Sequence, residues 1–203
     1  MSTDDYRPSR ADRFATWSFI ILGAIIVGWV LVHAVLRTID LLSPGPIDVP
    51  AEFLGTIAQA PIGEGGSDAP VALDSAVLTV AELPAASVVA GVLEQALLVA
   101  TVATVVTCLI LVTRGVLRGE VFSKRNTRLV ATAGIVGLVG AAAVPFFGNM
   151  VANGAFSSLG DFEEYAVMSI EPFPFVLAAF AIATVATAFT VGEKLQRETE
   201  GLV

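Results

Sequence analysis

The chain has 203 residues, of which 55% are apolar and only 15% are charged, and its mean hydropathy is +0.80. A soluble domain carries about 25% charged residues, so this composition excludes an ordinary soluble fold and predicts an integral membrane protein. The formal net charge is −8 and the basic residues form no broad face, which excludes nucleic-acid binding by the whole chain.

The apolar residues are concentrated in four stretches, each close to the length of about 20 residues that an α-helix needs to cross a bilayer. We therefore predict an all-α membrane protein that forms a single four-helix domain over residues 1–203. The predicted spans cover residues 14–36, 87–112, 129–147 and 172–191. We interpret the first as a retained helix, because its apolar core exceeds the roughly 7–15 residues of a signal peptide.

The segment between the first two spans, residues 39–86, is rich in Pro, Gly and acidic residues and contains no Lys or Arg. Apolar and polar residues alternate weakly from Val71 to Thr79, which is the two-residue period of a β-strand. We predict a small extracytoplasmic cap with short strands and no large core of its own. The second outer loop, residues 149–171, is also acidic, and neither loop has the spacing of a calcium or other metal site.

The basic segment 114–128 lies between the second and third spans and sets the predicted topology. Lys and Arg near the ends of spans resist translocation, so such a segment stays on the cytoplasmic side. Apart from Arg37, the remaining Lys and Arg residues lie in the two terminal segments, which predicts that both termini are cytoplasmic. The cations of the loop are Arg114, Arg118, Lys124, Arg125 and Arg128.

The same loop permits two interpretations. Simple anchoring by the positive charges explains it fully, but its apolar residues, including Val121 and Phe122, are also able to rest on the inner leaflet while the cations meet anionic head groups. Ser123 is the expected N-cap of the third helix, because a serine hydroxyl accepts a hydrogen bond from the first helical turn.

Two short stretches carry a resemblance to a known family. They are Gly119-Glu-Val-Phe-Ser-Lys-Arg-Asn126 in the basic loop and the tail GEKLQRETEGLV, residues 192–203. With them the chain resembles a family of uncharacterised four-helix bacterial membrane proteins, a domain of unknown function, and its Ala, Val and Gly content looks actinobacterial. The resemblance covers most of the chain outside the first outer loop. It implies a location in the bacterial plasma membrane and supplies no activity, cofactor or catalytic residue.

Three ionisable residues, His33, Arg37 and Glu94, are expected at the outer ends of the first two spans. An ionisable side chain within a span is costly and usually faces a partner or a wet cavity. These residues form either a proton or cation site or a static hydrogen-bonded pair near the interface. We predict that Glu94 lies against the first span and faces the bundle interior, within salt-bridge or water-bridge reach of His33 or Arg37.

Small residues form one face of the third span when 100° of rotation is assigned to each residue. This face consists of Ala133, Gly137, Gly140 and Ala141, flanked by Val144. Small residues let a second helix approach closely within a membrane. The face is therefore expected to pack within the protein's own bundle or, as an alternative, against a partner subunit.

The sequence contains no HExxH, no CxxC and no nucleophile elbow, and its single cysteine, Cys108, excludes an intramolecular disulfide. We therefore predict no enzymatic activity, no cofactor and no bound metal. The predicted role is that of an accessory or interaction subunit in a larger plasma-membrane complex, whose partners are the lipid bilayer and another membrane protein or a second copy. A small ion- or proton-coupled transporter that uses the His33/Glu94 region is the alternative, although the chain lacks a clear inverted repeat.

Overall fold

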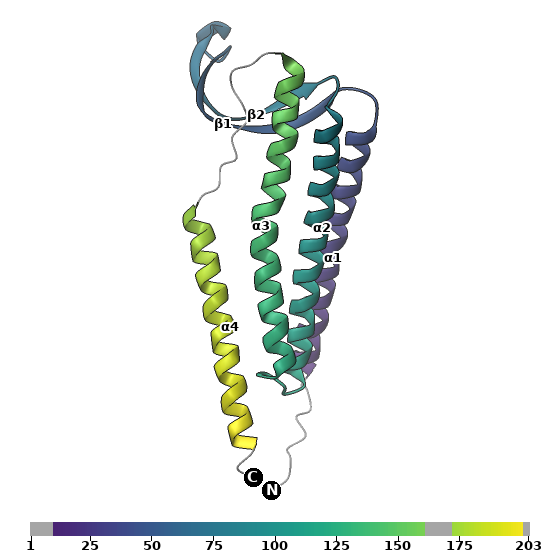
Figure 1. The fold of residues 1–203 in the computed structure, drawn as a ribbon, viewed down its shortest axis with the longest axis vertical. Helices are drawn as coiled ribbons and strands as arrows, with labels where there is room; N and C mark the ends of the chain where they lie inside the picture. The colour runs from purple at the N-terminus through teal and green to yellow at the C-terminus, as the bar shows by residue number, and fades with distance from the viewer. Residues whose placement is uncertain (1–9, 161–171, 201–203) are drawn as a thin grey trace. The chain divides into compact units, whose positions relative to one another are not determined.

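The computed structural model describes residues 10–160 and 172–200, and Figure 1 labels its helices and strands. The elements follow in the order α1 (Arg10–Leu42), β1 (Ile47–Ala60), the 3₁₀ turn η1 (Glu64–Gly66), β2 (Ala69–Val80), α2 (Ala85–Leu117), α3 (Lys124–Leu159) and α4 (Pro172–Glu200). Within these residues, four helices are long and apolar enough to cross a membrane. This agrees with the prediction and indicates a multi-pass membrane protein.

The third helix differs most from its predicted span, residues 129–147. The prediction that an outer loop begins at Asn149 was wrong, because α3 continues through Pro145 and ends at Leu159. A proline removes one backbone hydrogen bond, and membrane helices tolerate this loss where neighbouring groups satisfy the freed carbonyl. The rest of that predicted loop, residues 161–171, lies outside the described residues.

The chain divides into two compact units, a division that the sequence did not predict. The first, which we call the ribbon unit, contains residues 35–96 and 143–170. The second, the four-helix unit, contains residues 1–34, 97–142 and 171–203. Since α1, α2 and α3 each contribute residues to both units, the division falls within these helices and not in a linker.

The ribbon unit is named after the two-stranded antiparallel sheet formed by β1 and β2. The strands pair in register from Ile47 opposite Val80 to Ala60 opposite Ala69, with an irregularity between Glu52 and Thr56. The predicted strands are therefore present, but they span 14 and 12 residues and are not short. Gly55 has a φ of 71° at the irregularity, a left-handed conformation that glycine adopts without strain and that is typical of a β-bulge.

The part of the ribbon nearest the helices belongs to a buried hydrophobic core. Alternate residues of β1 point inward, as the two-residue period of a strand requires, and they meet the ends of the three helices. Among the described residues the predicted cap therefore has no large core of its own, because its strands and the helices share a single core. Its members are Leu41, Ile47, Val49, Ala51, Val80, Ala90, Val151, Ala152, Ala155 and Phe156.

The four-helix unit is held together by close approaches at glycines. Gly23 of α1 lies against Val106 and Ile110 of α2, so that little more than a hydrogen fits at that position. Gly140 of α3 is in the same tight relation to Thr101 of α2. In membranes, helices associate through such close van der Waals contacts, because lipid tails are as apolar as the side chains themselves.

Only part of the predicted small-residue face of α3 is packed, because Ala133 and Gly140 are buried whereas Ala141 is exposed. Gly140 provides the close contact with α2, whereas a methyl group at Gly137 would meet Val105 Cγ2 at an ordinary 3.8 Å. Gly134, which the sequence interpretation left out, lies against Ile182 of α4. The tightest contacts of α3 with its neighbouring helices are therefore at Gly134 and Gly140, about one turn before and after Gly137.

The basic loop is shorter than the predicted segment 114–128 and has a defined conformation. The Glu120 N–H donates to the Gly115 carbonyl at 3.0 Å. The Gly119 N–H donates to the Val116 carbonyl, also at 3.0 Å. This pair of bonds is the Schellman motif, which requires a left-handed residue, and Gly119 supplies it with a φ of 80°. The motif ends α2 and reverses the chain.

The start of α3 is fixed from the other side of the loop. The Asn126 N–H donates to Ser123 Oγ at 3.3 Å, which confirms Ser123 as the N-cap. The Asn126 amide group is 1% exposed and donates to the carbonyls of Glu120 and Val121 at 2.7 and 3.3 Å. A buried asparagine thus satisfies loop carbonyls that would otherwise lack donors.

Replacing Gly140 with alanine should destabilise the four-helix unit. The new methyl group would overlap Thr101, a β-branched residue whose side chain has few alternative rotamers, and overpacking of this kind costs about 1–3 kcal/mol. Gly137→Ala is the matched control, since its methyl group has room and alanine favours a helix by about 1 kcal/mol. Thermal unfolding in detergent should separate the two variants. Equal losses at both positions would contradict this packing.

Candidate functional site

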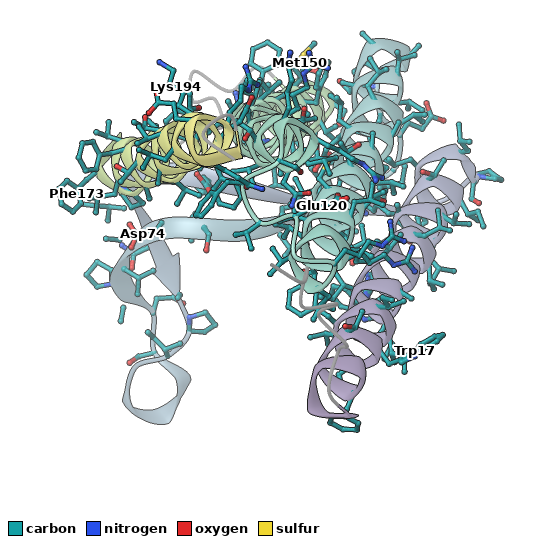
Figure 2. All side chains as sticks on the ribbon, turned by 90° about the horizontal axis from the view of Figure 1, so that it is seen from below. Trp17, Asp74, Glu120, Met150, Phe173 and Lys194 are labelled. Carbon is teal, nitrogen blue, oxygen red and sulfur yellow. The ribbon has the colours of Figure 1, made fainter. Side chains whose placement is uncertain are left out.

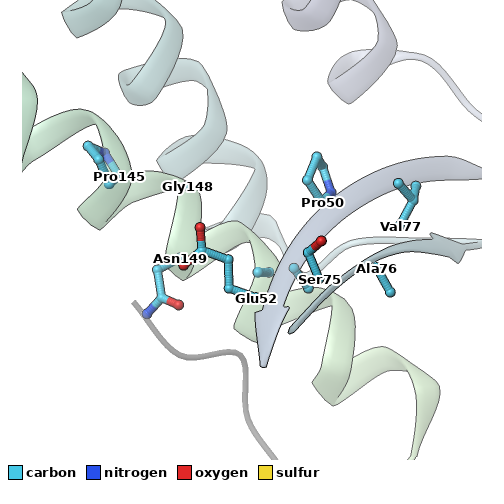
Figure 3. Close-up of a pocket in the computed structure, with 10 residues that line it drawn as sticks. Pro50, Glu52, Ser75, Ala76, Val77, Pro145, Gly148 and Asn149 are labelled. Carbon is cyan, nitrogen blue, oxygen red and sulfur yellow. The ribbon is translucent and has the colours of Figure 1, made fainter. Parts of the chain in front are cut away.

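The ribbon unit contains a cavity of about 470 Å³ between the ribbon and α3, drawn in Figure 3. Its polar side chains come from three elements, with Glu52 on β1, Ser75 on β2 and Asn149 on α3. Most of its other walls are apolar, and among them are Pro50, Val77, Pro145 and Ala152. An apolar cavity with a few polar groups converging from different elements is the usual form of a small-molecule site.

The register of the ribbon explains why two of these polar groups lie together. Glu52 and Ser75 are directly paired across the strands, which places their side chains on one face within about 4.5–5.5 Å at Cβ. The bulge follows immediately after Glu52, and bulges commonly redirect side chains beside functional sites. Figure 3 shows the Glu52 side chain extending from β1 toward α3, where Gly148 and Asn149 lie.

The surroundings of the cavity are acidic. No Lys or Arg occurs from residue 38 to residue 113, and none lines the cavity. A second carboxylate, that of Glu94 on α2, packs against Gly148, where a methyl group would lie 3.2 Å from Glu94 Oε1. Because residue 148 is a glycine, α3 leaves room for the Glu94 side chain of α2 at this position.

The predicted cluster of His33, Arg37 and Glu94 is divided between the two units. His33 belongs to the four-helix unit, is exposed, and stacks on Trp29 one turn earlier with ring centroids 4.5 Å apart. Arg37 and Glu94 belong to the ribbon unit and are both half-buried. The positive charge of Arg37 acts on the Glu94 carboxylate, although the described residues give Glu94 no ion pair within 4 Å. The functional role of the three residues stays a prediction.

The five predicted loop cations are all exposed, but only Arg118 lies outside the helices. Lys124, Arg125 and Arg128 occupy the first turns of α3, where the helix dipole disfavours positive charge. Helix stability therefore does not explain their position.

Phe122 in the same loop packs against α4 and is 37% exposed. Its ring meets that of Phe189 edge to face at 5.5 Å, and it covers Gly192, where a methyl group would overlap the ring. The motif that carries the family resemblance thus has a structural role, because it joins the basic loop to the last helix.

Sequence reasoning missed the cavity and its three polar residues. The alternation in β2 was visible, but the pairing of Glu52 with Ser75 depends on the register of two strands, which a single sequence does not specify. The extension of α3 past Pro145 hid Asn149, which the sequence assigned to a loop. Among the described residues, no group of His, Cys, Asp or Glu is placed to hold a metal ion.

No family model matches the chain, and neither the curated proteins nor the solved structures compared with it give a match. The resemblance to four-helix bacterial membrane proteins therefore stays a prediction.

Replacing Glu94 with glutamine should separate the static and the carrier interpretations. The variant loses the attraction to Arg37 and also the cost of burying a charge, so the free energy of unfolding should change by no more than about 1.5 kcal/mol. Under the static interpretation, proton flux into proteoliposomes is the same as for the original chain. Glu82→Gln, which changes an exposed carboxylate ahead of α2, is the control. Flux that disappears only in a folded Glu94→Gln variant would favour the carrier.

Proposed function

We propose that this chain is a non-catalytic integral protein of the bacterial plasma membrane that serves as an accessory or interaction subunit of a larger complex. The observation that carries the proposal is the distal part of the ribbon, residues 54–73. Phe53 is the last residue of β1 that packs against the core, through an edge-to-face contact with Phe156 at 5.5 Å. Beyond it no described side chain of the distal ribbon is buried, and Ile57 and Ile62 are 76% and 71% exposed.

A two-stranded ribbon without a core is marginally stable in water. Among the described residues the sheet consists of β1 and β2, so each strand has one edge that no described strand pairs with. Proteins usually shorten, charge or cover such an edge, because it recruits other strands. A long ribbon with exposed isoleucines is thus suited to pair with an extended segment of a partner.

The helices support lipid as the other partner. Trp17 near the start of α1 and Phe173 at the start of α4 point away from the neighbouring helices in Figure 2 and are largely exposed. Large apolar side chains in this position are costly in water and favourable in a bilayer. The same exposed apolar surface continues along α4 through Val176, Leu177 and Phe180.

The polar groups of α4 do not favour a carrier. The hydroxyls of Thr184, Thr187 and Thr190 each donate to the carbonyl four residues earlier, at 2.9, 2.8 and 2.8 Å. The hydroxyl hydrogens of these threonines are thus used within their own helix and are not aimed at a shared site. The exposed position of His33, stacked on Trp29, also gives no support to a proton site there.

We propose that both termini lie in the cytoplasm and that the ribbon lies outside. The exposed cations from Arg114 to Arg128 support this orientation, as does the lack of any cation from residue 38 to residue 113. A cytoplasm-active reporter fused after Val203 should be active, and an export-dependent reporter inserted at Gly65 should also be active. Activity of the opposite reporter type at both positions would reverse the orientation.

Shortening the ribbon should remove the partner without unfolding the protein. Ile57 and Ala72 are paired, so residues 58–71 are replaceable by Asn-Gly, which forms a two-residue hairpin turn. Thermal unfolding of this variant should be close to that of the original chain, because no buried residue is removed. Mild-detergent purification from native membranes, with mass spectrometry, should show a stoichiometric partner only with the full ribbon. A partner retained by both chains, or absent from both, would contradict the proposal.

A further inference from the structure

We infer that the basic loop and the end of α4 form a binding surface for an anionic phospholipid. The lipid phosphate lies on the loop cations, and its glycerol and first methylene groups lie in an apolar hollow beside them. The inference does not depend on the proposed role as an interaction subunit. It rests on the hollow, on the positive charge next to it and on the level of both along the helices.

The hollow has a volume of about 590 Å³ and lies within the four-helix unit, between the basic loop and α4. Its loop wall contains Val121 and Phe122, and its α4 wall contains Gly192 and Leu195. Phe122 is 37% exposed and Leu195 is 59% exposed. Large apolar side chains are costly in water, whereas at a membrane surface such residues insert between the head groups and the start of the acyl chains.

Cations flank the loop wall of the hollow on both sides. Arg118 directly precedes Gly119, the first residue of that wall, and Lys124 follows two residues after Phe122. Both cations are exposed, and no acidic side chain among the described residues lies within 4 Å of either. Arg197 on α4 differs, because it pairs with Glu193 at 2.7 Å. The charge of the loop is therefore available to an outside anion.

The cations and the hollow lie at the level where two candidate spans end. Arg114 is in the last turn of α2, and Lys124 is the first residue of α3. Arg128 is four residues further along, a rise of about 6 Å, which a long cationic side chain bridges by extending toward the surface. The contact between Phe122 and Phe189 joins α4 to the loop at the same level. For helices that cross a membrane, this is the level of the lipid head groups.

The charge balance favours a single phosphate that carries an apolar body. Segment 114–128 contains five cations and one acid, Glu120, which gives a net charge of 5 − 1 = +4. Glu198 lines the hollow itself and disfavours an anion inside it, so the phosphate belongs on the flanking cations. A water-soluble anion would leave the apolar walls uncovered. A zwitterionic lipid would bring a second positive charge close to the cations and bind more weakly.

Lipid titration of the full-length protein in mild detergent, followed by native mass spectrometry, tests the inference. The probes are dioleoyl phosphatidylglycerol and the phosphatidylcholine with the same chains. A cation near an anionic surface is worth roughly a fivefold gain in affinity, so the original chain should prefer phosphatidylglycerol at least tenfold. The double variant Arg118→Gln/Lys124→Gln should reduce this preference to less than threefold. Thermal unfolding verifies that each variant is folded, and the comparison of the two lipids on the original chain needs no variant.

The matched control is the double variant Arg10→Gln/Arg13→Gln. It removes the same charge from the first turn of α1, outside the basic loop, and should keep the tenfold preference. Equal losses in the two double variants would mean a general attraction of the chain's cations and would overturn the inference. Equal binding of the two lipids to the original chain would also overturn it.

A second arm distinguishes the lipid from a soluble phosphate and tests the hollow. Glycerol 3-phosphate, which has a phosphate and no acyl chain, should not displace phosphatidylglycerol at equal concentration. Leu195→Asn should weaken both lipids severalfold and leave the preference between them unchanged, because it changes the apolar wall and no charge. Displacement by glycerol 3-phosphate would assign the cations to a soluble anion and overturn the inference. Unchanged binding of both lipids to Leu195→Asn would overturn it as well.

Discussion

The need to satisfy backbone hydrogen bonds within hydrocarbon is the constraint on which this structure depends. Only closed helices meet it in a single segment, so four long helices form and their polar side chains turn back on the chain itself, as the threonines of α4 do. Strands, bulge and Schellman turn lie between the helices, where other groups complete their bonding. Many of the polar residues are consequently found in the ribbon and the basic loop, although Glu94 on α2 and Asn153 on α3 lie within helices.

The second requirement is close contact between helices, and glycine residues make that contact possible. Gly23 and Gly140 each receive a β-branched side chain of α2 at a distance that leaves no room for a methyl group, and Gly91 receives the more flexible Leu41 side chain. The same principle acts at the basic loop, where the buried amide of Asn126 lies against Gly115. Since association in lipid gains little from burying apolar surface, these contacts decide which helices meet. Both compact units therefore depend on the smallest residue in the chain.

Hydropathy and charge were enough to predict the four spans, and local pattern was enough to predict the N-cap at Ser123 and a strand before Val80. The features that the sequence analysis did not predict depend on contacts between distant parts of the chain. The core below the ribbon requires strands and helix ends to be assembled together, and the pairing of Glu52 with Ser75 requires the register. Depth along the helix placed Glu94 toward the outer end of α2, where that helix starts, but rotation about the helix axis decides which way a side chain faces. His33 is exposed and stacks on Trp29 one turn earlier, an i, i+4 contact that the helical period allows and that the prediction left out.

The long stretch without cations has a consequence for assembly in an energised membrane. Moving one elementary charge across a membrane potential is worth about 2.3 kcal/mol per 100 mV. In the proposed orientation, the segment from residue 38 to residue 113 carries only negative side chains, including Asp48, Glu52 and Asp74. An interior-negative potential therefore assists the transfer of the ribbon to the outside during insertion. The membrane potential would thus favour the outer position of the ribbon before any partner binds.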